Sequence, residues 1–438
     1  MIAAGQGRAL LSDLEATDLF RSGKLLADPY PYYDSLRSRC PVQREPHEGV
    51  VLVTGYDEAL AVYHDVATFS SCNSVTGPFP GFPVSLEGDD VSDLIERYRD
   101  ELPFSDQLPT FDPPKHTAHR GLLLRLLTPK RLKENEGAMW RLADRLIDEF
   151  IDAGQCALVG TYATPFAMLV IADLLGVPEG DHSAFREQLA KTTGFGTGEK
   201  ATMEHMPLSF LYDAFTSYVE DRRRRPRDDV LTGLAHATFP DGSTAEVADV
   251  TRLASNLFAA GQETTVRFQA FAVQVLAERP ELQHQLRCER GLIPNFIEET
   301  LRFESPIKGD FRLTRVPTTI GNVSIPAGTT VMVLNGAANR DTRRFEEPHR
   351  FVVGRPNARE HLAFGHGAHF CPGAPLARAE GRITVERMLD RMSDIGISET
   401  AHGPAGARQY RYIPTYMLRG LKELHIEFTS SGRPDATS

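Results

Sequence analysis

Phe364-Gly365-His366-Gly367-Ala368-His369-Phe370-Cys371-Pro372-Gly373-Ala374-Pro375-Leu376-Ala377-Arg378 is the stretch on which the interpretation of this chain depends. It places one cysteine between a glycine-punctuated loop and a segment, from residue 374 onward, that is typical of a helix. Gly365 and Gly367 allow a tight turn with positive φ and a close approach of the backbone to a flat ligand. Because a helix N-terminus stabilises negative charge, the segment predicts a site that holds a thiolate.

Three kinds of site remain possible for this loop taken alone. A single soft thiolate beside a flat ligand suits haem iron. His366, His369 and Cys371 could instead be three zinc ligands, but zinc normally takes a fourth ligand at similar spacing and none follows nearby. A lone cysteine can also be an ordinary core residue. Three further segments favour the haem site.

The first is an apolar repeat, from about residue 250 to 276, that predicts one long helix. Ala260 and Thr264 share a face of it because they are four residues apart. The small Ala260 and Gly261 would let a planar cofactor and bound oxygen lie against the helix, and Thr264 could break the local hydrogen-bond ladder and hold water, with the Glu263 carboxylate beside it. The alternative is a back-bonded threonine next to a surface glutamate.

The other two segments carry charge. Glu299 and Arg302, three apart on a predicted helix, would ordinarily form a solvated ion pair of small worth, and Pro348-His349-Arg350-Phe351 follows farther on. In 111–120, two prolines start a helix on which His116 and Arg120 lie one turn apart. One face of that helix therefore presents two donors to an anion.

Together these segments resemble the cytochrome P450 family. The resemblance runs from Ala27-Asp28-Pro29-Tyr30 to Arg419-Gly420-Leu421, and the four motifs occur in the family's order. It implies a mainly α fold with a smaller β region, in a single large domain over residues 1–438 around a buried haem b (iron protoporphyrin IX). We expect a flexible N-terminus over 1–25 and a disordered tail over 430–438.

The resemblance also assigns roles to residues. It implies Cys371 as the iron ligand, Glu263 and Thr264 as the acid and alcohol that relay protons to dioxygen, and Glu299, Arg302 and Arg350 as a buried charge network that holds the cysteine loop. The remaining cofactor contacts that it implies are four propionate partners, His116, Arg120, Arg312 and His369, and three residues against the haem, Phe364, Gly365 and Ala260. Two departures stand out: Pro317 and Thr318 replace an acid often found after Arg312, and Pro372 directly follows the ligand.

Composition argues against several other classes of protein. A net charge of −11 argues against a general nucleic-acid role, and no run of about 18 apolar residues exists to span a membrane. No signal-peptide pattern is present at the start. The five cysteines are odd in number and widely spread, so a disulfide framework is not expected and a reducing cytoplasm fits. We expect a cytoplasmic monomer.

The coarse pattern predicts helices at 54–66, 116–126, 136–153, 163–175, 205–225, 246–277, 280–288, 292–304 and 374–392. It predicts strands at 42–53, 311–322, 329–334 and 409–428. Residues 68–110 show little regular pattern, and long irregular stretches in a compact domain are often functional covers. The glycine-rich loop 192–198 is interpreted as a second cover that gates entry.

The predicted function is insertion of one oxygen atom from O2 into a small lipophilic substrate, by hydroxylation or epoxidation. The resemblance implies that a ferredoxin and a flavin-dependent ferredoxin reductase supply electrons, and Arg125, Lys130, Arg131 and Lys133 could give a docking face local positive charge. A peroxygenase or rearrangement enzyme, which needs no electron partner, and a non-catalytic haem-based ligand-binding protein are the alternatives.

The substrate pocket is expected to draw on loops 72–110 and 190–210, the central helix, and the segments 307–310 and 414–417. Its proposed lining residues are Asn256, Leu257, Ala260, Ile307, Lys308 and Tyr416. Most of these are apolar or small, which favours a lipophilic molecule. Lys308 and Asp310 would either recognise a polar substrate end or point to solvent, the more usual place for a charged side chain.

Overall fold

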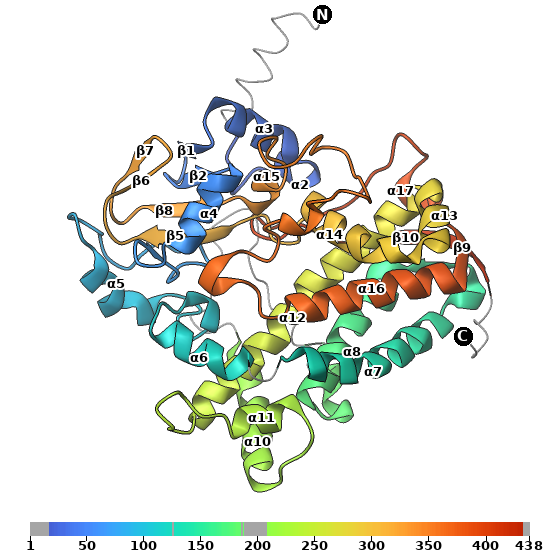
Figure 1. Ribbon diagram of the computed structural model, residues 1–438, viewed down its shortest axis with the longest axis horizontal. Coiled ribbons are helices and arrows are strands. Elements are labelled where there is room, and N and C mark those ends of the chain that lie inside the picture. The colour runs from blue at the N-terminus through green and yellow to red at the C-terminus, as the bar shows by residue number, and fades with distance from the viewer. Residues whose placement is uncertain (1–16, 125–126, 185–186, 188–207, 432–438) are drawn as a thin grey trace, which may run out of the picture.

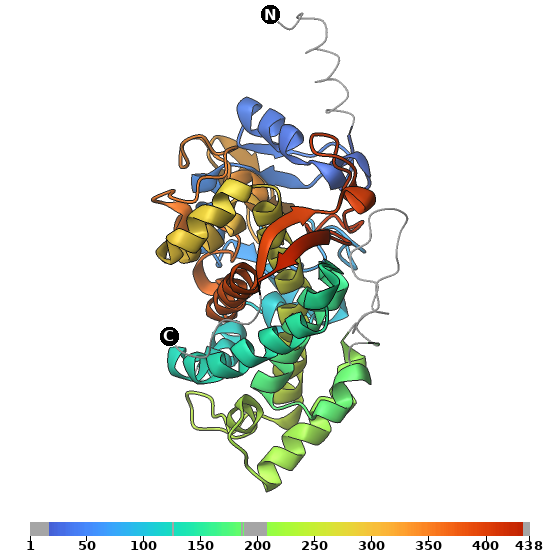
Figure 2. The same cartoon turned by 90° about the vertical axis from the view of Figure 1, so that its right-hand side faces the viewer.

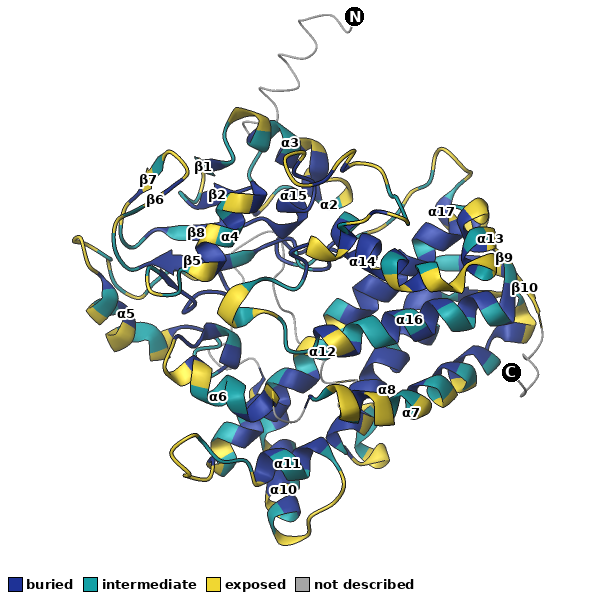
Figure 3. Ribbon diagram, viewed as in Figure 1, coloured by how far each residue is buried: buried dark blue, intermediate teal, exposed yellow. Residues whose placement is uncertain are grey.

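The longest helix, α12 (Val247–Ala277), crosses the middle of the molecule, and its bounds confirm the predicted helix 246–277. It appears in the computed structural model, which describes residues 17–124, 127–184, 187 and 208–431. From Thr265 to Ala277 every residue of α12 except Gln274 is buried, as Figure 3 shows by the dark blue of that helix. Helices α8 (Thr164–Leu175), α10 (Ser209–Arg224) and α16 (Ala374–Arg391) pack against it.

Eleven further α-helices lie in the described part of the chain. They are α2 (Lys24–Ala27), α3 (Tyr30–Arg39), α4 (Tyr56–His64), α5 (Ser92–Tyr98), α6 (Lys115–Leu124), α7 (Pro129–Asp148), α11 (Val230–Ala235), α13 (Pro280–Cys288), α14 (Ile293–Phe303), α15 (Asn335–Ala338) and α17 (Glu399–His402). Every predicted helix therefore has a counterpart. Among the described helices, none has a stretch both long and apolar enough to cross a bilayer.

One group of strands forms a β region to one side of the long helices, at the upper left of Figure 1. A five-stranded sheet has the order β1-β2-β8-β5-β3, formed by β1 (Val42–Arg44), β2 (Val51–Val53), β8 (Thr330–Val333), β5 (Asp310–Thr314) and β3 (Phe69–Ser70). β2 and β8 are parallel, and the other pairs are antiparallel. Strands β6 (Thr318–Ile320) and β7 (Val323–Ile325) form a hairpin.

A second sheet lies against the end of α12 (Figure 2). It has the order β4-β10-β9, with β4 (Gln155–Ala157), β10 (His425–Ser430) and β9 (Met392–Ile397). The predicted strand 409–428 is wrong for most of its length: besides β10, which begins at His425, the segment forms isolated bridges at Tyr412, Leu418 and Leu421. Pro414 interrupts the segment because it has no N–H to give to a ladder.

Two further boundaries differ from the pattern. The predicted strand 42–53 is a hairpin, because the Glu45 carboxylate accepts hydrogen bonds from the N–H groups of His47 and Glu48 and turns the chain. Helix α7 begins at Pro129, seven residues before the predicted start of 136. There the Thr128 side chain accepts a hydrogen bond from Arg131 N, and proline at the first helical position is favourable.

Both ends of the described chain contact the core. Leu19, Phe20 and Leu25 are buried in a cluster with Phe311 and Tyr416. At the other end, β10 continues to Ser430 and the N–H of Ser431 donates to Arg391 O. The flexible N-terminus over 1–25 and the disordered tail over 430–438 stay predictions.

Candidate functional site

The cysteine loop reaches α16 over a short 3-10 turn, Gly367–His369, that contacts α4. Gly365 and Gly367 have φ of 64° and 68°, the positive values that the sequence predicts. A Cβ on Gly367 would lie 2.7 Å from Tyr63 O, so only glycine lets the loop approach α4. Cys371 N donates to Phe364 O at 2.9 Å, which closes the loop around the sulfur.

The sulfur of Cys371 lies at the start of α16, where positive groups converge. Burial raises the pKa of the Cys371 thiol, while the N–H groups of Gly373 and Ala374 and the charge of Arg120 act in the opposite direction. The two N–H groups can donate hydrogen bonds to a thiolate, but burial still favours the neutral thiol. A further positive partner such as iron would make the thiolate the favoured form. This fits a metal-bound thiolate.

Pro372 lies outside α16, whose first turn contains Pro375 instead. Proline 372 is therefore not needed to start the helix, and it withholds one N–H from the neighbourhood of the sulfur.

We predict that Pro372→Ala raises the reduction potential of the bound iron, because an added N–H donor would lessen the charge on the thiolate. One hydrogen bond of about 1 kcal/mol corresponds to a rise of about 40 mV. Redox titration at constant haem spin state measures it, with Pro375→Ala as the proline control. An unchanged or lowered potential in Pro372→Ala would contradict an electronic role.

The two histidines and two arginines assigned to the propionates come together in space. The rings of His116 and His369 stack with centroids 3.8 Å apart, and both nitrogens of the buried His116 lack a partner among the described residues. Arg120 donates to Phe370 O, and Arg312 lies over the Tyr63 ring. Two stacked imidazoles and two guanidiniums thus form one cluster.

This cluster carries an excess of positive charge, because Asp112, the carboxylate that acts on His116, is already paired with Arg99 and Arg315. Burial and then Arg120 lower the pKa of His116 to about 4. Burial, then Arg312 and His116, lower the pKa of His369 to about 2. Neutral imidazoles beside two guanidiniums fit the two carboxylates of a haem, which would occupy the orphaned donors. On this observation the residues present fit the cofactor.

The zinc alternative for the loop does not fit the geometry. His366 points to α4, where its Nδ1 lies 2.7 Å from His64 Nε2, while His369 stacks on His116. The three candidate ligands therefore do not converge. Among the residues that the structure describes, no group of three or more His, Cys, Asp or Glu side chains could hold a metal ion.

The oxygen-side face of α12 carries the predicted small residue and hydroxyl. Ala260 is exposed although it lies mid-helix, as expected of a residue beside a cofactor. Thr264 Oγ1 donates to Ala260 O at 2.9 Å. The expectation that Thr264 breaks the helix ladder is wrong, since α12 is continuous through this turn. The hydroxyl oxygen still has lone pairs with which to accept a hydrogen bond from water.

Glu263 has a partner that the sequence reasoning missed. Its carboxylate pairs with Arg267 one turn along α12, and Arg267 also donates to Leu421 O at 2.9 Å. Gly420 makes room, because a Cβ there would lie 2.1 Å from Arg267 Cδ. The spacing of four residues between an acid and an arginine on one helix could have predicted this pair. Arg267 therefore sets where the Glu263 carboxylate rests.

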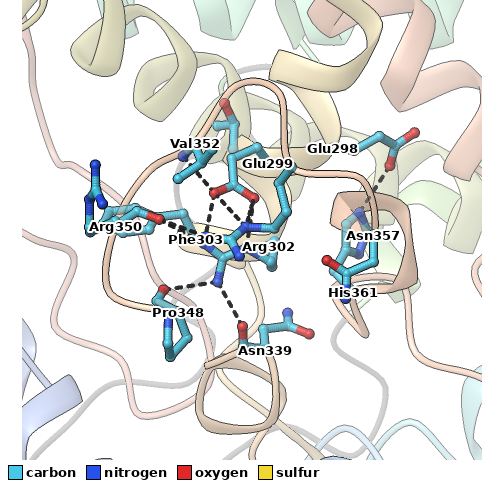
Figure 4. Close-up of polar contacts among 12 residues, drawn as sticks. Glu298, Glu299, Arg302, Phe303, Asn339, Pro348, Arg350, Val352, Asn357 and His361 are labelled. Atoms are coloured by element: carbon cyan, nitrogen blue, oxygen red, sulfur yellow. Dashed lines mark hydrogen bonds and ion pairs between the residues drawn. The ribbon is translucent and has the colours of Figure 1, made fainter. Parts of the chain in front are cut away.

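Glu299 and Arg302 form an ion pair, drawn in Figure 4, and each side chain is 0% exposed. Arg302 donates to both carboxylate oxygens, at 2.7 and 2.8 Å, and to the carbonyls of Asn339 and Pro348. The pair therefore ties α14 to the loop that precedes the cysteine.

The third member of the network needs correction. The Arg350 side chain is 67% exposed and pairs with Glu347, and only its carbonyl accepts from Arg302. The cation that reaches Glu299 is Arg355, whose Nε lies 3.0 and 3.1 Å from the carboxylate oxygens. The path of the loop after Pro348 turns Arg350 outward and Arg355 inward.

A second ion cluster next to this one was not predicted. Glu298 accepts hydrogen bonds from Arg378 on α16, at 2.7 and 3.0 Å, and lies 3.0 Å from His361 Nε2. Burial opposes ionisation of Glu298, but His361 and Arg378 outweigh it and lower its pKa to about 2. Arg378 also lies over the Phe364 ring. Both ends of the cysteine loop are thus anchored to α14.

The uncharged residues predicted to line the pocket differ in their surroundings. Asn256 and Ile307 are half-buried, and Leu257 is buried. Tyr416 packs into the cluster with Phe20 and Phe311 and donates to Thr76 O at 2.9 Å. Its ring is therefore a core residue here, which corrects its assignment to the pocket.

The charged pocket candidates do not point to solvent. Lys308 is buried, and its Nζ donates to Thr415 O at 2.6 Å. Asp310 accepts from Tyr63 OH at 2.5 Å and from Asn335 Nδ2 at 3.0 Å. The interpretation of these two as solvated side chains is therefore wrong.

The remaining predicted regions are only partly described. Lys130 and Lys133 are exposed and Arg131 is half-buried, all at the start of α7, while Arg125 lies outside the described residues. The loop 192–198 and most of 190–210 also lie outside them. In 68–110 the structure adds the short helix α5 and two 3-10 turns to an otherwise irregular segment.

Comparisons with known proteins identify the family. A family model described as Cytochrome P450 matches residues 208–394. Cytochrome P450 monooxygenase PikC of Streptomyces venezuelae is 33% identical over 408 residues, 92% of this chain and 91% of that protein. 6-Deoxyerythronolide B hydroxylase of Saccharopolyspora erythraea is 31% identical over 404 residues, 91% of this chain and 96% of that protein.

A solved structure is similar over nearly the whole chain. Substrate-free cytochrome P450 CYP150A6 of Mycobacterium marinum superposes with a TM-score of 0.90 at 56% identity, covering 96% of this chain and 100% of that one. The thiolate loop, the donor cluster and the buried ion pair lie in the same fold as these relatives. The chain therefore belongs to the cytochrome P450 family and is a haem b-binding monooxygenase.

Proposed function

We propose that this protein inserts one atom of O2 into a lipophilic small molecule, by hydroxylation or epoxidation. A substrate C–H bond or double bond gains one oxygen, two electrons and two protons are consumed, and the second oxygen leaves as water. A ferredoxin and a flavin-dependent ferredoxin reductase deliver the electrons. The observation that supports the proposal is the exposed Ala260 in the middle of α12, whose carbonyl accepts from Thr264, on a helix that packs against α16, the helix that begins just after Cys371.

The residues of this chain would divide the work. Cys371 would hold the iron, and His116, Arg120, Arg312 and His369 would bind the propionates. When bound, the haem supplies the activation of dioxygen, which a thiolate ligand favours. Thr264 would position a water molecule, and Glu263, held by Arg267, would pass protons from the exposed end of its side chain.

Oxygen and electron consumption test the proposal. With surrogate ferredoxin and reductase and a bound ligand, NADPH and O2 should be consumed together with formation of an oxygenated product. A peroxygenase would form product from hydrogen peroxide but not from NADPH, and a ligand-binding module would consume neither. Either of these results would overturn the proposal.

Thr264→Ala is expected to keep ligand binding but to uncouple electron use from product formation. Without the hydroxyl the relay water loses its partner, so product per NADPH should fall by about tenfold or more while released hydrogen peroxide rises. Thr264→Ser keeps the hydroxyl and serves as the matched control. Unchanged coupling in the alanine variant would remove Thr264 from the proton relay.

A further inference from the structure

Lys308 is a buried cation held on a rigid piece of backbone. Its side chain belongs to a residue only 7% exposed, on the extended segment that leads into β5. Its N–H donates to Met417 O at 2.8 Å, and its carbonyl accepts from Gly336 N at 3.3 Å. The neighbouring Ile307 forms a bridge with Leu418. The position of Lys308 is therefore fixed from both sides.

The side chain leaves the backbone on the same face of this segment as Asp310 and Arg312. Side chains alternate along an extended chain, so Lys308, Asp310 and Arg312 share a face. At Asp310 and Arg312 this face is turned toward the cysteine loop and α4. A Cβ on Gly365 of the loop would be 3.9 Å from Asp310 Oδ2, and Arg312 lies over the ring of Tyr63 on α4. Phe311, between them, packs on the other side against Phe20 and Tyr416.

The amine has donors without a negative partner. Nζ donates to Thr415 O at 2.6 Å, whereas an ammonium carries three donors. Among the described residues the charged group that acts on it is another cation, Arg419, and burial followed by Arg419 lowers the pKa of Lys308 to about 7. The acids nearby have other partners: Glu304 pairs with Arg419 at 2.9 Å, and Asp310 accepts from Tyr63 and Asn335.

A buried amine without a counter-ion lowers stability unless a ligand brings the missing charge. A buried lysine that donates to the Thr415 carbonyl and has donors left over has the chemistry to bind an oxyanion. The propionate cluster is already supplied with two arginines and two histidines, so Lys308 is not needed for it. Its unmet donors are thus available to a substrate.

We propose that Lys308 binds the carboxylate of the substrate, so that the molecule oxidised here is a lipophilic carboxylic acid. This inference rests on the proposed monooxygenase function and names the substrate class of the same pocket. Anchoring one end of the molecule at Lys308 leaves its apolar part to lie along Leu257 and Ala260 of α12. Lys308 would then select both the substrate and the region of it that is oxidised.

The test compares acids with their own methyl esters. Dodecanoic acid, abietic acid, cholanic acid and biphenyl-4-carboxylic acid, each paired with its ester, are titrated into the holoprotein while the low-spin to high-spin change and the heat of binding are followed. At least one acid is expected to bind about tenfold or more tightly than its ester, as one charge-assisted contact implies. No acid preference anywhere in this panel would overturn the proposal.

Two variants then assign the preference to the amine. Lys308→Met keeps the length of the side chain but removes the charge, so acid and ester should bind alike, while Lys308→Arg should keep most of the preference. Because a buried unpaired charge is lost, Lys308→Met should unfold at an equal or higher temperature than the native chain. An acid preference that survives in Lys308→Met would contradict the proposal.

The failure of this inference is distinguishable from failure of the proposed function. A protein that oxygenates neutral lipophilic molecules and ignores the acids would retain the monooxygenase assignment and lose the role of Lys308. A protein that binds acids through Lys308 but consumes no NADPH or O2 with them would retain the binding site and lose the proposed reaction.

Discussion

Cys371→Ser is expected to abolish the far red-shifted Soret band that haem-thiolate proteins show when reduced and bound to carbon monoxide. A hydroxyl or alkoxide cannot supply the soft donation of a thiolate to the iron. The propionate cluster and the anchors on Glu298 and Glu299 remain, so the variant should still fold. Loss of the band should be complete rather than graded.

The matched control is Cys288→Ser, an exposed cysteine on α13 far along the chain from the loop. It should leave the band unchanged. A normal band in Cys371→Ser would contradict the ligand assignment, and a lost band in Cys288→Ser would show that the assay reports general damage.

Glu299→Gln is expected to yield protein with little or no haem. The substitution leaves the buried guanidiniums of Arg302 and Arg355 without their shared carboxylate. Removing one partner of a buried pair costs about 3–5 kcal/mol, a large part of the stability of a typical domain. Because the same carboxylate accepts from Val352 N at 2.9 Å, the loop before the cysteine would also lose its anchor.

Haem content per chain and urea unfolding measure this effect. Glu347→Gln is the control, since it breaks the exposed pair with Arg350 in the same loop and should change neither quantity. Full haem occupancy with an unchanged unfolding midpoint in Glu299→Gln would contradict the structural role of the buried pair.

Periodicity and motif spacing predicted the helices and the pairs of candidate residues that share a helix face. His116 and Arg120 lie one turn apart on α6, and Ala260 and Thr264 one turn apart on α12, so local geometry already placed each pair on one face. The early start of α7 was missed although Thr128 and Pro129 carry the capping signal for it.

Other features depend on the path of loops, which local sequence does not determine. Arg350 and Arg355 are both arginines shortly after Pro348, and only the tertiary course of that loop decides which one reaches Glu299. The sequence left Lys308 between the pocket and solvent, with solvent favoured by the usual preference of charged side chains, but alternation with Arg312 was a signal that it faces inward. The partner of Glu298, Arg378, comes from α16 and lies 80 residues farther along the chain.

The most direct test of the central claim is to run the reconstituted reaction under isotopically heavy dioxygen in ordinary water, with a ligand that produces the high-spin change. We predict a product that carries one heavy oxygen atom per molecule, with NADPH consumed in step and the other atom recovered in water. A product that takes its oxygen from water, or product formation that persists without O2 and NADPH, would contradict the account.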